Sequence, residues 1–313
     1  MITGCSGFIG FHFSKFLLER NFEVYGLDSL NDYYDQNLKK SRLRNLHEFE
    51  KFSFKKLNIS NFKKLSDFVE NINPGIIINL AAQAGVRYSK INPVSYIESN
   101  ISGFSNLLLS AKNVKAKLIY ASSSSVYGES KNIPFKEDEK FLEPLSLYGI
   151  SKKYNELISK NFYDQFGFKS IGLRFFTVYG SWGRPDMAYY KFSEALKKDK
   201  KIIVFNEGNM SRDMTHISDI CNGIYLSMKF KTQKNEIFNL GNSSPVKVSH
   251  LIRHLEKHFR KKAKISYKKS TDEIKKTYAD LTKSKKYLGY NPKIKFEEGM
   301  KEFLDWFDEY NLR

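Results

Sequence analysis

The chain has 313 residues, of which 41% are hydrophobic and 15% aromatic, enough for one or two folded domains. No apolar run approaches the ~20 residues that span a bilayer. Cys5 and Cys221, its two cysteines, form no metal or redox motif, so we expect a cytoplasmic protein without membrane insertion. The net charge is +18. Because the lysines are not interleaved with aromatic residues, we expect a basic surface and no nucleic-acid partner, although its field favours anionic ligands.

The first half of the chain alternates β-rich runs with helical patterns, which predicts an α/β fold with a doubly wound parallel sheet. Irregular elements follow residue 176. We predict a Rossmann domain at residues 1–175, a smaller, interleaved substrate domain at 176–313, and a return of segments of 214–241 to the first domain. The expected strands are 23–28, 52–57, 75–80, 117–121, 169–175, 202–205 and 236–240; the expected helices are 10–20, 61–71, 93–112, 145–166, 250–259 and 296–310.

The first strand looks short. Only Met1, Ile2 and Thr3 precede the first glycine, whereas a buried strand usually has about five or six residues. We therefore expect that residues are missing upstream, and that an extended chain melts at a higher temperature.

A glycine-rich turn, residues 4–10, lies between that strand and the first helix. Glycines let the backbone approach a pyrophosphate, and the helix N-terminus favours its negative charge. Asp28 ends the next strand, where a carboxylate accepts hydrogen bonds from ribose hydroxyls and repels a 2′-phosphate, which favours NAD over NADP. Asn58 follows the third strand, near the expected adenine. The predicted cofactor contacts are Gly4, Gly7, Phe8, Ile9, Gly10, Asp28, Asn31, Asn58, Ile59, Leu80, Ala81, Ala82, Asn100, Ser122, Tyr148, Lys152 and Phe175.

Tyr148 and Lys152 are four residues apart, which places them on one face of a helix. An ammonium about 4 Å from a phenolate, at an effective dielectric of ~20, lowers the phenol pKa by about 3 units. Such a tyrosine can act as a general base. The spacing alone is weak evidence, but a serine run at 122–125 follows the fifth strand. Serine runs also mark turns; here a serine hydroxyl can bind the substrate oxygen that Tyr148 deprotonates.

These features together resemble the extended short-chain dehydrogenase/reductase family, and the whole chain is similar to its UDP-glucuronate 4-epimerases. The resemblance implies tightly bound NAD that is not consumed, with Tyr148 removing the proton of the sugar 4-hydroxyl. It implies that Lys152 lowers the tyrosine pKa and holds the nicotinamide ribose, that Ser123 occupies the catalytic Ser/Thr position, and that Ser125 faces the sugar. The motifs that carry it are residues 31–35, 81–89, 173–180 and 183–188.

Three arginines are candidates for binding an anionic substrate, because a guanidinium fork suits phosphate and carboxylate. By the resemblance, Arg212 contacts the diphosphate, while Arg87 and Arg184 meet either the diphosphate or the uronate. For each, a surface ion pair is the alternative. The sequence departs from the family pattern at Asn58, Ser181, Met214, His216 and Ser218. The predicted substrate contacts are Arg87, Ser123, Ser125, Thr177, Arg184, Asn206 and Arg212.

The serine run also bears on the reaction type. Related 4,6-dehydratases carry Asp-Glu where this chain has Ser124 and Ser125, so elimination is disfavoured. Decarboxylation of a 4-keto uronate remains open, and we expect Ser125 and Thr177 to restrain the carboxylate. The alternatives are a 4-epimerase of UDP-glucose or UDP-N-acetylglucosamine, a UDP-glucuronate decarboxylase, or a non-catalytic NAD-binding module.

His250, His254 and His258 have a spacing compatible with metal ligands, but the neighbouring basic residues oppose a cation, and we expect no metal site. By family analogy, the helices at 93–112 and 145–166 form a homodimer interface. The expected role is in polysaccharide biosynthesis.

Overall fold

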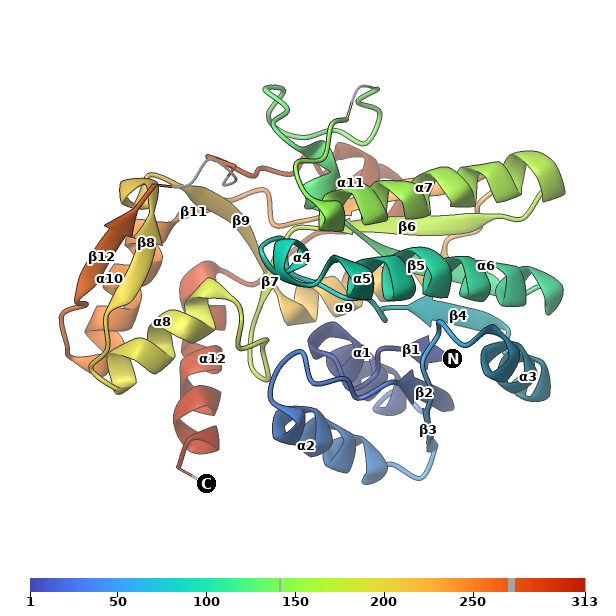
Figure 1. Cartoon of the computed structure of the whole chain (residues 1–313), viewed down its shortest axis with the longest axis horizontal. Coiled ribbons are helices and arrows are strands. Elements are labelled where there is room, and N and C mark those ends of the chain that lie inside the picture. The colour runs from blue at the N-terminus through green and yellow to red at the C-terminus, as the bar shows by residue number, and fades with distance from the viewer. Residues whose placement is uncertain (141, 270–273, 313) are drawn as a thin grey trace.

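The computed structural model describes residues 1–140, 142–269 and 274–312 (Figure 1). Its largest element is a seven-stranded sheet in the order β10-β6-β5-β4-β1-β2-β3, and all of its strand pairs are parallel. This confirms the predicted doubly wound α/β fold. The strands are β1 (Ile2–Thr3), β2 (Val24–Asp28), β3 (Phe52–Lys56), β4 (Ile76–Asn79), β5 (Lys117–Ser123), β6 (Ser170–Phe175) and β10 (Glu236–Leu240).

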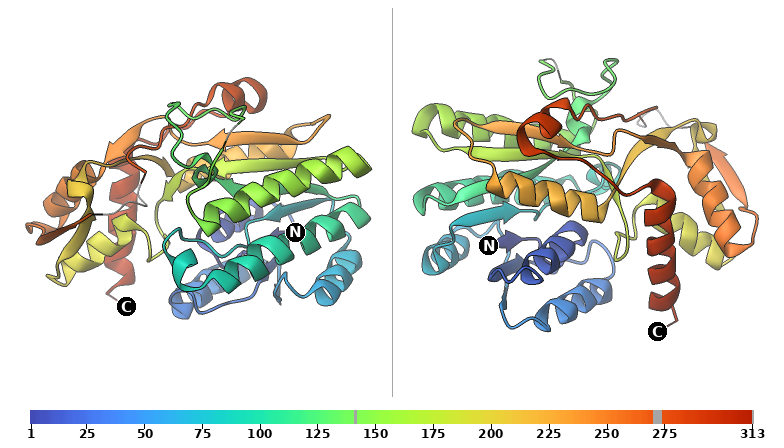
Figure 2. Two further views of the ribbon diagram at one scale, coloured as in Figure 1. Left: turned by 45° about the horizontal axis from the view of Figure 1, so that its top comes forward. Right: turned by 180° about the vertical axis from the view of Figure 1, so that it is seen from behind.

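Helices cover both faces of this sheet (Figures 1 and 2). On one face lie α1 (Phe8–Leu18), α2 (Gln36–His47) and α9 (Ile217–Lys229), and on the other α3 (Phe62–Ile72), α6 (Phe104–Asn113) and α7 (Leu147–Phe166). Each face has its own apolar core, with Phe11 and Ile220 in the first and Leu107 and Tyr120 in the second. The central strands β4, β5 and β6 are buried along most of their length, as strands covered by helices on both faces should be.

The predicted helix at 93–112 is confirmed, but it is not an α-helix throughout. After a separate short helix, α4 (Tyr88–Ile91), the segments α5 (Pro93–Tyr96), a π-helix η1 (Ile97–Gly103) and α6 follow one another without a break. A π-turn inserts one extra residue into the helix. Gly103 packs so closely on Ile59 that a Cβ would lie 2.7 Å from its Cγ1, while Asn100 binds the main chain of Gln83. We attribute the π-turn to these two contacts.

A second, smaller unit lies beside the carboxyl ends of the strands. It contains a three-stranded sheet in the order β11-β9-β7 and a two-stranded sheet, β12-β8. Helices α8, α10 and α12 pack around a core that includes Tyr189, Leu255 and Phe303. The bounds are β7 (Thr177–Tyr179), β8 (Ile202–Phe205), β9 (Ser211–His216), β11 (Pro245–Lys247), β12 (Ile265–Lys268), α8 (Ala188–Lys197), α10 (Val248–Phe259) and α12 (Phe296–Tyr310).

The chain passes between the two units more than once (Figure 2). After β9 it re-enters the first unit, where α9 packs on α1 and β10 pairs with β6 from Glu236↔Ile171 to Leu240↔Phe175. Short α11 (Thr282–Leu288) packs next to β10 before the chain returns to α12. The carboxyl ends of the central strands therefore face a cleft whose far wall is made by the second unit.

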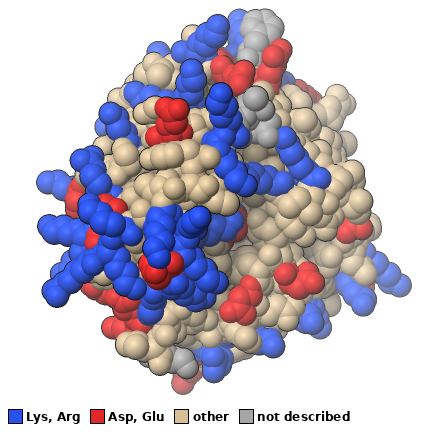
Figure 3. All heavy atoms as spheres, turned by 60° about the vertical axis from the view of Figure 1, so that its left-hand side comes forward, with Lys and Arg blue, Asp and Glu red and all other residues tan. Residues whose placement is uncertain are grey.

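Exposed basic side chains gather on the side of the second unit formed by α8, α10 and β12 (Figure 3). Some are neutralised locally, since Lys264 pairs with Asp199 and Lys262 lies 3.5 Å from a Glu256 oxygen. None of this group lines the large cleft. The group comprises Lys200, Lys201, Arg260, Lys261, Lys262, Lys264 and Lys268.

Candidate active site

A cavity of about 720 Å³ opens between the sheet and the second unit, at the sheet edge where ligands bind in doubly wound folds. Most of the predicted site residues line it. From the cofactor set these are Gly4, Gly7, Phe8, Ile9, Gly10, Asp28, Asn31, Asn58, Ile59, Leu80, Ala81, Ala82, Ser122, Tyr148, Lys152 and Phe175, and from the substrate set Arg87, Ser123, Ser125, Thr177, Arg184 and Arg212.

The glycine turn is shaped for close approach to a ligand. Gly4 has φ +73°, and a Cβ there would lie 2.7 Å from the Ala81 nitrogen; a Cβ on Gly10 would lie 2.0 Å from the Gly4 oxygen. The turn therefore accepts no side chain at either position, and the chain runs from it directly into the first turn of α1. Such a cradle fits the pyrophosphate of a dinucleotide.

Asp28 ends β2 beside this turn and is 9% exposed. Its Oδ2 accepts from the Ser6 N–H at 3.0 Å and its Oδ1 from the Leu30 N–H at 2.8 Å. Burial raises the pKa of this carboxyl, although these two hydrogen bonds oppose the shift. Each oxygen keeps a lone pair, so the geometry fits ribose hydroxyls, and the glycine cradle together with Asp28 fits NAD.

Tyr148 and Lys152 both reach the cavity from α7, but they are not coupled as the spacing predicted. Burial raises the pKa of Tyr148 above its ordinary value, opposed by the Ser123 hydroxyl and the Arg184 charge. Burial lowers the pKa of Lys152 to about 8, and its Nζ donates to the Ala121 carbonyl at 2.8 Å. Lys152 is not among the groups that shift the pKa of Tyr148 in this arrangement, so the lowering of that pKa by Lys152 stays a prediction. The positive charge that favours the phenolate comes from Arg184.

Ser123 and Ser125 lie where β5 passes into a 3-10 turn, η2 (Ser124–Tyr127). The Ser123 hydroxyl donates to the Ser125 Oγ at 3.2 Å and accepts from the Ser125 N–H at 3.1 Å. Both hydroxyls line the same cavity as Tyr148. Two hydroxyls and a phenol thus surround one space, which suits binding and deprotonation of an alcohol.

Arg184 is held in a bidentate ion pair with Asp186, with Nε–Oδ1 at 2.9 Å and Nη2–Oδ2 at 2.5 Å. Tyr33 donates its hydroxyl to the same carboxylate at 3.1 Å. Burial would raise the pKa of Asp186, but Arg184 outweighs it and holds the pKa below the ordinary value. The pairing uses Nε and Nη2 of the guanidinium, so Nη1 is the group that can face a ligand anion.

Arg87 and Arg212 occupy two further positions on the cavity wall. The Arg87 guanidinium lies 3.9 Å from the centre of the Phe205 ring, a contact between the first unit and the second. Arg212 donates to the carbonyls of Ser211 at 3.1 Å and Ile274 at 2.7 Å. Both arginines are thus oriented by the protein itself before any ligand is bound.

Asn100 and Asn206 do not line the cavity. Asn100 is 1% exposed; it binds both main-chain groups of Gln83 and donates to Ser151 Oγ at 3.0 Å. It therefore connects the loop after β4 to α7, behind the wall. Asn206 begins the turn η3 (Asn206–Gly208) after β8.

Sequence reasoning did not select several charged or aromatic side chains of the wall, among them Tyr33, Lys39, Asp186 and Lys191. Lys39 donates to the Asn31 carbonyl and side chain. Tyr33 and Asp186 belong to motifs quoted for the family resemblance, and an acid two residues after Arg184 was a usable signal for an ion pair. Lys39 lies on α2, which was not predicted, and so had no structural context.

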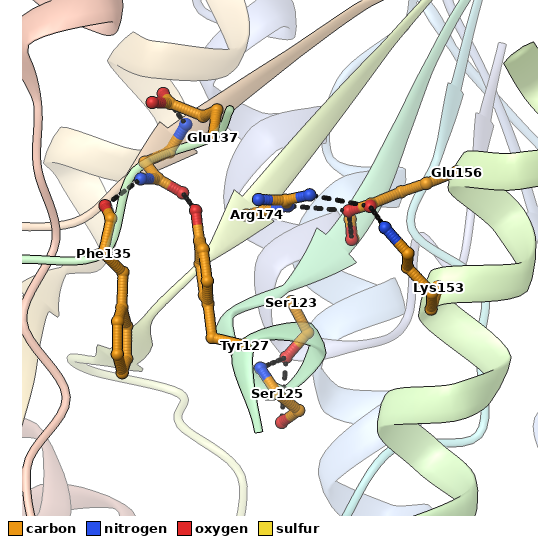
Figure 4. Close-up of polar contacts among 10 residues, drawn as sticks. Ser123, Ser125, Tyr127, Phe135, Glu137, Lys153, Glu156 and Arg174 are labelled. Atoms are coloured by element: carbon orange, nitrogen blue, oxygen red, sulfur yellow. Dashed lines mark hydrogen bonds and ion pairs between the residues drawn. The ribbon is translucent and has the colours of Figure 1, made fainter. Parts of the chain in front are cut away.

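A buried polar network supports the serine turn from behind (Figure 4). Arg174 and Glu156 form a bidentate pair at 2.8 and 2.9 Å with both side chains 2% exposed, and Ser122 donates to Glu156 at 2.6 Å. On the other side, the Tyr127 hydroxyl donates to Asn239 Oδ1 at 2.7 Å. The network joins β5, β6, α7 and β10 at the level of Ser123.

Among the described residues, no group of three or more His, Cys, Asp or Glu side chains is arranged to hold a metal ion. His250 and His258 instead face Glu297 and Asp308 of α12, at 3.1 and 2.9 Å. No described helix is long and apolar enough to cross a membrane.

The doubly wound sheet, glycine cradle and Ser-Tyr-Lys wall define a dinucleotide-binding protein of the short-chain dehydrogenase/reductase class. A family model described as GDP-mannose 4,6 dehydratase matches residues 1–303. The chain belongs to this family of extended short-chain dehydrogenases/reductases, which confirms the resemblance drawn from the sequence.

Two related sequences and one solved structure are similar to nearly the whole chain. The UDP-glucuronate 4-epimerase of Thermodesulfobacterium geofontis is 41% identical over 312 residues, covering 99% of this chain and 96% of that protein. UDP-glucuronate 4-epimerase 4 of Arabidopsis thaliana is 40% identical over 329 residues, covering 99% and 75%. The structure of UDP-glucuronic acid 4-epimerase from Bacillus cereus, in complex with UDP-glucuronic acid and NAD, superposes with a TM-score of 0.93 at 32% identity, covering 99% and 98%.

Proposed function

We propose that the protein is an NAD-dependent 4-epimerase that interconverts UDP-glucuronate and UDP-galacturonate. The observation that carries this is the charge of the cavity beside Tyr148. Among its described lining residues, seven are basic and two acidic, which suits ligands that bring a diphosphate and a carboxylate. Three proteins similar to 99% of the chain are named for this activity.

Arg184 is the side chain best placed for the uronate. It is close enough for its charge to lower the pKa of Tyr148, and the sugar carboxylate is attached to the carbon next to the reacting C4. We assign the carboxylate to the Nη1 side of Arg184 and the diphosphate to Arg212, in the second unit. Residues 176–313 would then supply most contacts to the nucleotide sugar, and residues 1–175 most contacts to the cofactor.

The mechanism follows from where the side chains lie. Ser123 and Tyr148 hold the 4-hydroxyl of the sugar, and Tyr148 takes its proton. NAD, when bound, supplies the chemistry of accepting and returning a hydride. Lys152, whose Nζ donates to the Ala121 carbonyl near the end of β5, would hold the nicotinamide ribose. The 4-keto sugar turns over within the cavity, and Tyr148 then returns the proton to the oxygen of the C4 epimer.

The family model is described by a dehydratase activity, but the chemistry of the serine turn argues against elimination here. Dehydration needs an acid and a base next to the catalytic hydroxyl, and Ser124 and Ser125 occupy those positions. A serine hydroxyl is a far weaker acid and base than a carboxyl group at neutral pH. Epimerisation needs no acid or base besides Tyr148, which takes the hydroxyl proton and later returns it.

The function is tested by incubating purified protein with UDP-glucuronate and following the anomeric signals by NMR. UDP-galacturonate should form without net reduction of NAD. UDP-glucose and UDP-N-acetylglucosamine, tested in parallel, should react at least about tenfold more slowly, because they lack the carboxylate partner of Arg184. Formation of a UDP-pentose as the main product would instead identify a decarboxylase, and no turnover from NAD-loaded protein would refute the proposal.

Thr177 is expected to protect the keto intermediate from losing CO₂. It lines the cavity at the start of β7, where a hydroxyl can hold the carboxylate in plane. Thr177→Ala should raise the fraction of UDP-pentose by about tenfold at similar binding of UDP, measured by NMR. Thr232→Ala, which changes a half-buried threonine that bonds within its own turn, is the matched control. An unchanged product ratio would remove Thr177 from this role.

A homodimer is the expected assembly. Helix α7 exposes Ile150 and Leu157, seven residues apart and 50% and 56% exposed, and the adjacent segment exposes Ile91, Val94 and Ile97. These helices pack side by side, so the apolar side chains form one surface suited to self-association.

Leu157→Glu should convert the dimer into a monomer, halving the mass in sedimentation, because it places a charge within the buried contact. Leu312→Glu, which changes an 83% exposed leucine, should have no effect. A wild-type monomer at micromolar concentration would contradict the assignment of this surface.

The two described cysteines are buried and free, and we propose that the enzyme works in the cytoplasm, in polysaccharide biosynthesis.

A further inference from the structure

Arg42 is a fully buried arginine, 0% exposed, on the inner face of α2. None of the carboxylates in the described parts of the chain forms an ion pair with it, although an unpaired buried charge is costly. Its contacts are oxygen atoms of two separate loops. Nη1 donates to the Ser6 carbonyl at 3.0 Å and to the Tyr34 hydroxyl at 2.7 Å. Nη2 donates to the carbonyls of Trp182 and Gly183 at 2.5 and 3.1 Å.

The two loops belong to different halves of the cavity. Ser6 lies in the glycine turn, and its own N–H is bound by Asp28, so the Arg42 contact fixes the segment that faces the dinucleotide. Trp182 and Gly183 immediately precede Arg184, the side chain assigned to the sugar acid. A single guanidinium thus uses all four of its Nη hydrogens to join the cofactor turn to the substrate loop.

The substrate loop, residues 181–183, also has side-chain contacts of its own, since Trp182 packs against the rings of Phe11, Trp306 and Tyr310 and the Ser181 hydroxyl donates to Glu302 at 3.2 Å. Its main chain is held in a different way. Trp182 has φ +56°, a conformation costly for a non-glycine residue unless the surroundings enforce it. The Ser181 carbonyl accepts from His12 Nε2 at 2.8 Å. Burial lowers the pKa of His12 to about 3, so this ring is a neutral donor. Three consecutive carbonyls of the loop are therefore bound by side chains of α1 and α2.

We propose that Arg42 is a positioning residue that couples NAD retention to recognition of the sugar acid. It holds the glycine turn and the Arg184 loop at one fixed separation, while touching neither ligand itself, since it does not line the cavity. This deepens the proposed function and rests on it for the identity of the sugar. Loss of the guanidinium removes the hydrogen bonds to the Ser6 carbonyl on one side and to the two carbonyls that precede Arg184 on the other.

The test compares Arg42→Met, Arg42→Lys and a control, Arg44→Met. Arg44 lies on the same helix but is exposed, and its side chain donates to Ser41 Oγ at 2.9 Å. We expect Arg42→Met to lose at least about half of its co-purified NAD and to raise KM for UDP-glucuronate about tenfold, with kcat within about threefold when NAD is saturating. Arg42→Lys keeps the charge, but one ammonium cannot span both loops, so both effects should appear at reduced size.

Two outcomes would overturn the proposal. One is a folded Arg42→Lys or Arg42→Met protein with wild-type NAD content and KM. The other is a loss of kcat of about tenfold with an unchanged KM, which would indicate a general disturbance of the active site. Should Arg42→Met fail to fold, the Lys variant decides. NAD content measured after denaturation does not depend on the sugar, so it separates failure of this proposal from failure of the epimerase assignment.

Discussion

Replacing Tyr148 with phenylalanine should lower kcat for UDP-glucuronate epimerisation by about 10²–10⁴-fold, the usual contribution of a positioned general base. The substitution removes one oxygen and keeps the ring, which packs edge-on against Tyr96 at 6.2 Å. Folding and NAD content should therefore be unchanged, and KM should change little. The measurement is steady-state NMR kinetics together with the thermal midpoint of each protein.

Tyr154→Phe is the matched control, since it removes a hydroxyl from the same helix. That hydroxyl bonds to Ser105 at 2.9 Å, away from the cavity, so kcat should stay within about threefold of the wild type. A Tyr148→Phe protein retaining a tenth or more of wild-type activity would mean that another group takes the proton.

Glu156→Ala should lower the free energy of unfolding by about 3–5 kcal/mol, because it leaves the Arg174 guanidinium buried without its carboxylate. Burial would lower the pKa of Arg174, but Glu156 outweighs that effect and raises it, a sign of how strongly the pair is coupled. Ser122 also loses its acceptor, so the serine turn should loosen. Urea unfolding monitored by circular dichroism gives the free energy, and kcat reports on the turn.

The control for this prediction is Asp164→Ala, which breaks an exposed pair on the same helix, Lys160–Asp164, and should cost no more than about 0.5 kcal/mol. A Glu156→Leu, Arg174→Met double variant should recover most of the lost stability, since it removes both charges together. A loss below about 1 kcal/mol for Glu156→Ala alone would show that the pair contributes little.

The sheet was predictable because its strands carry a regular signal. β-rich segments of four to seven residues recur with helical stretches between them, and this alternation predicts a doubly wound fold. The positions of Gly4, Asp28, Ser123 and Tyr148 follow from that order, because each lies at or just after the end of a strand or at the start of a helix. The cavity wall therefore contains most of the residues selected from sequence.

Helix α2 shows why other parts were missed. Its core-facing positions include Leu38, Arg42 and Leu46, at intervals of four. Because the middle one of these three positions is an arginine, the apolar periodicity that would predict a helix is interrupted there. Asp35, which caps the helix by accepting from the Asn37 N–H at 2.8 Å, was the available signal. The residue that obscured the helix is the one assigned a coupling role here.

The electrostatics of Tyr148 were not predictable from spacing. The interval between Tyr148 and Lys152 fixes a shared helix face, but it does not say where the ammonium binds. The Ala121 carbonyl takes it, and Arg184, 36 positions further along the chain than Tyr148, supplies the charge instead. Contacts between segments so distant in sequence have no local pattern from which to infer them.

The pairing of β10 with β6 also has a consequence for how the protein is made. Until Glu236–Leu240 leaves the ribosome, the edge of β6 that faces away from β5 has no partner. An unpaired edge of an apolar strand can pair with another chain. Roughly 60 residues separate the two strands, which at about 5–20 residues per second amounts to roughly 3–12 s of synthesis. During that interval the nascent sheet is incomplete, and aggregation or chaperone binding competes with its closure.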